Sequence, residues 1–125
     1  GVGFAVLAVL IGSFALHKIN TPANAGEYDA FAQCLTDKGV IMYGAWWCPH
    51  CTNQKKLFGN SFKKVHSIEC AQPGNPNAQT RECDEAKIKG YPTWVFADGS
   101  RIEGEASFDA LAQKTSCTLP LYDKK

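Results

Sequence analysis

Apolar and polar positions along residues 27–119 follow two periods, one helical and one extended. Tyr28, Phe31 and Leu35 recur at helical spacing, whereas the run from Val40 to Tyr43 is continuous and β-prone, as in a buried strand. Asp98-Gly99, between two short apolar runs, is a hairpin signal. In chain order, the predicted elements are a helix over 27–37, a strand over 40–44, a helix from about 48 to 58, a short strand over 66–70, a helix over 79–88, a hairpin of strands 93–96 and 101–103, and a helix over 107–114.

Turn-forming residues set the expected ends of these elements. Gly39 ends the first helix, and Gly59-Asn60 ends the second. Residues 71–78 are rich in Pro, Gly and Asn, so we expect a loop there. Ser107 is expected to cap the last helix.

The first sixteen residues, Gly1 to Leu16, carry no charge and are nearly all apolar. A helix needs ~20 residues to span a bilayer, so we interpret residues 1–17 as the remnant of a transmembrane helix. The alternative is the core of a signal peptide, because Ala23-Asn24-Ala25 has the small-x-small form of a cleavage site. With residues 1–17 as the transmembrane remnant, residues 18–26 are interpreted as a linker, residues 27–119 as the folded domain and residues 120–125 as a polar tail. Both interpretations place the domain outside the cytoplasm, in a periplasmic or cell-surface location.

Composition narrows the class of protein. A chain of 125 residues is long enough for one domain with appendages. Its net charge of +1 creates no broad field that would attract nucleic acid, and no such partner is expected. Six cysteines are many for a reducing cytosol, and their even number favours an oxidising compartment.

The candidate chemistry lies in Cys48-Pro49-His50-Cys51, between a predicted strand and a predicted helix. Two cysteines separated by two residues in this context are typical of a redox motif. The thiolate is the nucleophile in disulfide exchange. Unpaired N–H groups and the helix dipole at a helix N-terminus would stabilise a thiolate on Cys48.

The neighbouring residues would tune this thiolate. Pro49 fits the first helical turn, and His50 adds a hydrogen-bond donor and, when protonated, a positive charge. Cys51, one turn further along, would resolve the mixed disulfide formed on Cys48. Because a stabilised thiolate favours the reduced pair, we expect an oxidase or isomerase rather than a strong reductant. Trp47 is expected to line the site.

The sequence also resembles a known family. Trp47-Cys48-Pro49-His50-Cys51 together with Gly90-Tyr91-Pro92-Thr93 is similar to thioredoxin-fold disulfide oxidoreductases, and the Pro-His dipeptide is similar to that of periplasmic DsbA-type oxidases. The ordered set of residues 42–51, 57–59, 69–70 and 91–94 resembles the thioredoxin-like domain fused to bacterial vitamin K epoxide reductase homologues. The similarity covers about Tyr28 to Cys117. It implies an α/β thioredoxin fold, with a central mixed sheet flanked by helices, which the order of the predicted elements also indicates.

The resemblance implies further roles. Pro92 would be the cis-proline that faces the cysteine pair, and the backbone of Tyr91 would bind the substrate chain. The domain would lie beside a membrane reductase that reoxidises it with quinone, and no organic cofactor would be needed within the domain. Thioredoxins carry a buried acid six residues before the first active-site cysteine, but Met42 occupies that position here. Resolution by Cys51 is therefore expected to be slower, or to use another base.

The other four cysteines allow more than one interpretation. The family has a second cysteine pair placed like Cys70 and Cys83, which would act either as a redox relay or, as we prefer, as a structural disulfide pinning the loop between them. Cys34 and Cys117 would then pair with each other or remain as two buried thiols.

The sequence as a whole predicts a membrane-anchored, extracytoplasmic thiol–disulfide oxidoreductase that acts on cysteines of exported proteins. The main alternative is a copper or zinc metallochaperone that uses Cys48 and Cys51 as ligands. A second CxxC or a suitably spaced Cys/His pair is missing, so no metal site is predicted. A redox-inert binding module with only structural cysteines is a further alternative.

Overall fold

The structure is a computed structural model that describes residues 26–120. The predicted transmembrane remnant, nearly all of the linker and the residues of the tail after Pro120 lie outside this range. Within residues 26–120, no helix is long and apolar enough to cross a membrane.

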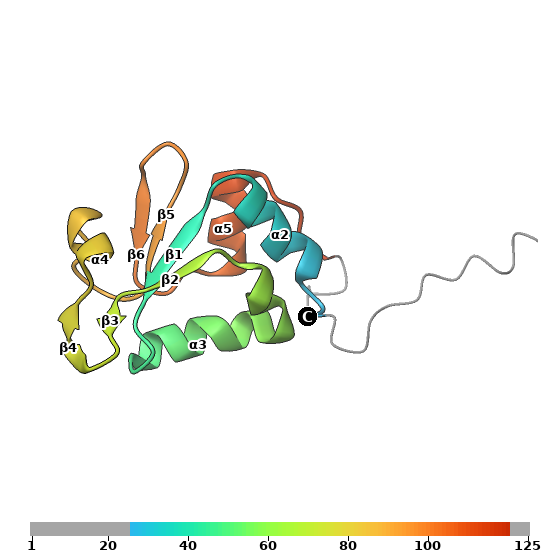
Figure 1. Ribbon diagram of the computed structural model, residues 1–125. Coiled ribbons are helices and arrows are strands. Elements are labelled where there is room, and N and C mark those ends of the chain that lie inside the picture. The colour runs from blue at the N-terminus through green and yellow to red at the C-terminus, as the bar shows by residue number, and fades with distance from the viewer. Residues whose placement is uncertain (1–25, 121–125) are drawn as a thin grey trace, which may run out of the picture.

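A four-stranded mixed sheet organises the domain (Figure 1). Its strands are β1 (Ile41–Gly44), β2 (Ser67–Glu69), β5 (Thr93–Val95) and β6 (Arg101–Glu103), arranged in the order β2-β1-β5-β6. Strand β1 is parallel to β2 and antiparallel to β5, and β5 is antiparallel to β6. A central mixed sheet flanked by helices fits the thioredoxin-like fold that the sequence predicts.

One face of the sheet is covered by three helices, which are α2 (Asp29–Asp37), α3 (Pro49–Phe58) and α5 (Phe108–Thr115). Met42 and Trp94, which are register partners on β1 and β5, point into this core. The ring of Phe58 lies 4.7 Å from that of Phe108 and 6.1 Å from that of Trp94, measured between centroids. Burial of these rings helps to hold α3 against the sheet.

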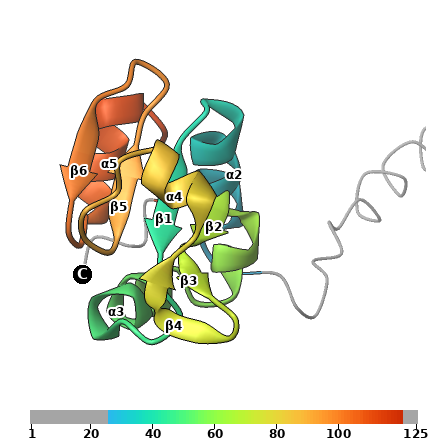
Figure 2. The same cartoon turned by 60° about the vertical axis from the view of Figure 1, so that its left-hand side comes forward.

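The opposite face carries a smaller core. Side chains alternate between faces along a strand, so Tyr43 points away from Met42 and packs with Ile88, Cys70 and Cys83. Helix α4 (Arg81–Glu85) lies over this face, in front of the sheet in Figure 2.

Several sequence signals are confirmed. Gly39 and Gly59 follow α2 and α3 with φ values of +81° and +56°, which a side chain would disfavour. The Oγ of Ser107 accepts a hydrogen bond from the backbone N–H of Ala110 and so caps α5. Gly99 has a φ of +86° in the turn between β5 and β6. A 3-10 helix, η1 (Gly59–Lys64), follows α3.

Two predictions between β2 and β5 are wrong. Residues 71–78 do not form a plain loop but most of a hairpin, with strands β3 (Ala71–Gln72) and β4 (Asn75–Gln79). The proline in β4 is tolerated because the hairpin is a separate two-stranded sheet with free edges. The predicted helix over 79–88 shrinks to α4, because Gln79 ends β4 and Lys87, with a φ of +58°, stops the helix.

Candidate active site

Strand β1 and helix α3 bring Cys48 and Cys51 to one place. Cys48 is the N-cap of α3, with φ −80° and ψ 123°, and Pro49 is the first helical residue, where its missing N–H leaves no hydrogen bond unmade. Both thiols are free in the structure. Cys48 is 6% exposed and Cys51 is fully buried. An attacking sulfur at the rim and a shielded sulfur behind it are the arrangement that disulfide exchange requires.

The Cys51 thiol is strongly biased toward its protonated form. The pKa of Cys51 is raised to about 11, mainly by burial and in part by the nearby Cys48, whereas a backbone hydrogen bond from Ala45 and the charge of Lys55 oppose the shift. Cys51 therefore loses its proton only with help or at high pH.

Tyr91 contacts the cysteine pair from the segment before β5. The Tyr91–Pro92 peptide bond is cis, as the resemblance implies. The thiol of Cys48 donates to the carbonyl oxygen of Tyr91 across 3.6 Å. The rings of Trp47 and Tyr91 meet edge to face, 5.9 Å apart between centroids. Trp47 thus lies beside Tyr91, with 44% of its surface exposed.

His50 has a partner that the sequence did not reveal. Its Nδ1 lies 2.8 Å from Oε2 of Glu105, which comes from the segment between β6 and α5. This hydrogen bond is the main reason why the pKa of the Glu105 carboxyl lies below its usual value, and the amide of Asn53 adds to the effect. Glu105 is 55 residues away in sequence, so no local spacing could have pointed to it.

The β3–β4 hairpin forms one wall beside the site. The indole N–H of Trp47 donates to the carbonyl oxygen of Pro76 over 2.9 Å. The hydroxyl of Tyr91 donates to Oε1 of Gln79, and Nε2 of Gln79 donates to Oδ1 of Asp84 and to the carbonyl oxygen of Ile88. Burial raises the pKa of the Tyr91 phenol, with a smaller contribution from Asp84.

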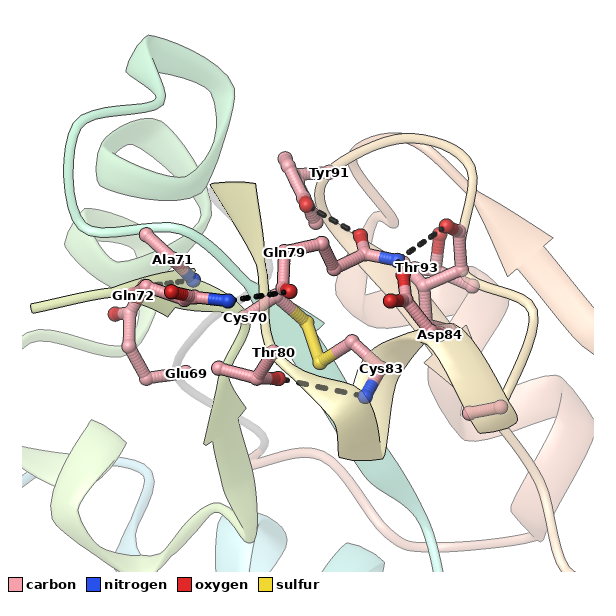
Figure 3. The surroundings of a disulfide bond; sticks show 12 residues. Glu69, Cys70, Ala71, Gln72, Gln79, Thr80, Cys83, Asp84, Tyr91 and Thr93 are labelled. Carbon is pink, nitrogen blue, oxygen red and sulfur yellow. Dashed lines mark hydrogen bonds between the residues drawn. A yellow bond between two sulfur atoms is a disulfide. The ribbon is translucent and has the colours of Figure 1, made fainter. Parts of the chain in front are cut away.

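A disulfide anchors this wall. Cys70, which directly precedes β3, and Cys83 of α4 are bonded, with their Cα atoms 5.6 Å apart, and Figure 3 shows this bond beside Gln79. A second disulfide joins Cys34 of α2 to Cys117 beyond α5, with Cα atoms 5.9 Å apart. The structure therefore leaves only Cys48 and Cys51 of the six cysteines unbonded.

Residues 26–120 contain no group of three or more His, Cys, Asp or Glu side chains placed to hold a metal ion. A metal on Cys48 and Cys51 would have only these two thiol ligands from this part of the chain.

Comparison with known proteins gives evidence on function that is independent of the geometry. Part of the chain is similar to a thiol–disulfide oxidoreductase. The relative is the thiol-disulfide oxidoreductase LTO1 of Arabidopsis thaliana, which is 37% identical over 93 residues, or 72% of this chain. The matched region makes up 24% of LTO1, so the chain spans about a quarter of the length of this curated relative. None of the known protein-family profiles matches the sequence. The resemblance to the vitamin K epoxide reductase homologues stays a prediction.

Proposed function

We propose that the chain is a thiol–disulfide oxidoreductase domain that exchanges disulfides with exported proteins through Cys48 and Cys51. The observation that carries the proposal is that these two thiols alone are free among six cysteines, at the start of α3 and against the carbonyl of Tyr91. The similarity to LTO1 supports the same class of reaction.

Donation of a disulfide proceeds in two exchanges. A substrate thiolate attacks the sulfur of Cys48, the Cys48–Cys51 bond breaks, and Cys51 leaves and takes up a proton. A second substrate thiolate then attacks the substrate sulfur of the mixed disulfide, and Cys48 leaves as a thiolate at the N-terminus of α3. The substrate has then lost two electrons, and the cysteine pair has gained them.

Location and partners belong to the same proposal. Two disulfides besides the active pair favour an oxidising compartment. The apolar residues 1–16 support an anchor in a membrane, with the domain outside the cytoplasm. The reduced pair would be reoxidised by a quinone-coupled membrane partner, either fused to the domain or separate, as the family resemblance implies.

The test is the reduction potential of the Cys48–Cys51 pair in glutathione buffers, with a Cys48→Ser variant as the control without a pair. A value of ~−120 to −180 mV supports an oxidase or isomerase, and a value near ~−270 mV indicates a reductase. A pair that does not exchange with glutathione would overturn the proposal. Stoichiometric copper or zinc binding without disulfide transfer would favour the metallochaperone.

A further inference from the structure

A small cavity lies behind the cysteine pair, between α3, β1 and β2. It has a volume of about 120 Å³ and is lined by Met42, Gly44, Lys55, Ser67, Ile68 and Glu69. Ser67 and Glu69 are exposed, so the cavity is open to solvent on the β2 side.

Gly44 connects this cavity to Cys51. A Cβ atom on Gly44 would lie 3.0 Å from the sulfur of Cys51 and 3.1 Å from Cε of Met42. The cavity therefore reaches the bare backbone against which the Cys51 sulfur packs. Met42, at the position where thioredoxins have an acid, is an apolar wall that can accept no proton.

Lys55 is the only cationic residue among those that line the cavity. It follows Cys51 by four residues on α3, a spacing that places two side chains next to each other on one helix face. It is half-buried, with its ammonium 5.6 Å from the centroid of the Phe62 ring. A positive charge in this place favours the thiolate form of Cys51.

A backbone hydrogen bond from Ala45 also favours the thiolate of Cys51, but none of the other side chains around the sulfur does so. Cys48 favours the protonated form of Cys51, and a charged Tyr91 phenolate would repel its thiolate. The Oε2 of Glu69 already accepts hydrogen bonds from the backbone N–H groups of Trp46 and Ala71, each at 3.0 Å. These bonds hold the Glu69 carboxylate at the mouth of the cavity.

We propose that Lys55 and this cavity assist the release of the Cys51 proton, in place of the missing acid at position 42. The inference rests on the proposed function and assigns Lys55 as a positioning residue that acts on Cys51 by charge. In the resolving step, the Cys51 thiol passes its proton through cavity water to solvent. The thiolate then attacks the Cys48 sulfur of a mixed disulfide, the Cys48–Cys51 bond forms, and the substrate leaves as a thiolate.

The test measures the reactions of the Cys48 and Cys51 thiols one after the other. The 125-residue chain, with its Cys48–Cys51 pair reduced and its other disulfides intact, is reacted with 5,5′-dithiobis(2-nitrobenzoate) at low pH, where Cys48 forms a mixed disulfide and releases one thiolate. A stopped-flow jump to pH 6–9 then starts the attack by Cys51, which releases a second coloured thiolate. Lys55→Gln is compared with Lys56→Gln, which removes the same charge from an exposed position of α3.

In Lys55→Gln, we expect the second release of coloured thiolate to slow about three-fold for each unit by which the Cys51 pKa rises. A higher pKa lowers the fraction of Cys51 that is thiolate, but it also makes each thiolate a stronger nucleophile, which offsets part of the loss. Lys56→Gln should leave the rate unchanged, and Lys55→Arg should restore it. A second release of equal rate in both Gln variants would overturn the role of Lys55, while leaving the proposed function intact. Loss of the first release in the unmodified chain would instead contradict the proposed function.

Discussion

The side-chain amide of Gln54 hydrogen-bonds both backbone groups of Ala106. Its Nε2 donates to the Ala106 carbonyl over 2.9 Å, and its Oε1 accepts from the Ala106 N–H over 2.7 Å and from the indole N–H of Trp94 over 3.1 Å. Gln54 is fully buried. The second turn of α3 and the segment before α5 are therefore held as one unit, which places Glu105 beside His50.

Gln54→Leu is expected to destabilise the fold by about 2–4 kcal/mol, because it keeps the volume but leaves buried donors and acceptors of Ala106 and Trp94 without partners. The measurement is the free energy of unfolding in urea. Gln33→Leu, on the exposed side of α2, is the matched control and should change this free energy by less than about 0.5 kcal/mol. Equal effects of the two substitutions would show that the Gln54 amide is not a structural clamp.

The two disulfides should differ in their contribution to stability. The Cys34–Cys117 bond closes 83 residues of chain and the Cys70–Cys83 bond closes 13. In the chain-entropy model these loops correspond to about 4.5 and 3 kcal/mol. Replacing each pair with alanine, in separate variants, should lower the free energy of unfolding in that order.

The variant without the Cys70–Cys83 bond should also have a looser β3–β4 hairpin beside the active site. Tyr91 and Trp47 would be affected, because both donate hydrogen bonds to this hairpin. Faster quenching of Trp fluorescence by acrylamide in this variant, but not in the Cys34–Cys117 variant, would report the loosened wall. The reverse order of stabilities would contradict the entropic account of the two bonds.

Periodicity predicted the elements whose residues face a core. The helix over 27–37, the strand over 40–44 and the hairpin around Asp98-Gly99 all have apolar residues at a regular spacing, and each appears within two residues of its predicted bounds. The β3–β4 hairpin was missed because its strands are mostly exposed and bury no regular apolar face. Its stability comes from a disulfide and from side chains such as Gln79, which have no periodic signal.

The site was predictable only where it is local in sequence. Cys48, Pro49 and Cys51 form one motif, so spacing and the expected helix start were enough to find them. Glu105 and Gln54 were missed because their importance depends on contacts 52 to 55 residues away. A polar residue such as Gln54 also looks like an ordinary solvated helix position until the fold shows that it is buried.

Acid should weaken the β5–β6 turn through Asp98. Its Oδ1 accepts hydrogen bonds from Oγ of Ser100 at 2.6 Å and from the Ser100 N–H at 2.9 Å. The Ser100 side chain is the main cause of a lowered pKa of Asp98. A carboxyl with a lowered pKa stabilises the fold fully above its unfolded value of ~3.9 and loses this contribution as the pH falls through the folded value.

Asp98→Asn should therefore be less stable than the unmodified chain at pH 6, and the difference should shrink as the pH falls from 5 to 2. Ser100→Ala should show a weaker form of the same pattern, because one hydrogen bond to the carboxylate remains. The measurement is the free energy of unfolding in urea at each pH. A difference that is constant with pH would contradict the linkage.

The two active-site thiols should differ strongly in reactivity. In Cys48→Ala, the pKa of Cys51 is read from the pH dependence of its alkylation by iodoacetamide. This pKa should fall below about 11, because the contribution of Cys48 is lost, but it should stay above the ordinary value of 9, since burial is the larger cause. At pH 8 the thiolate would be at most about a tenth of the thiol, and burial would slow its reaction further.

In Cys51→Ala, Cys48 should react readily at neutral pH and hold a glutathione mixed disulfide that nothing resolves. Mass spectrometry of samples quenched over time gives both rates, and the same variants in denaturant provide the control in which the thiols should react alike. Equal rates for the two thiols in the folded chain would contradict the division into an attacking and a resolving cysteine.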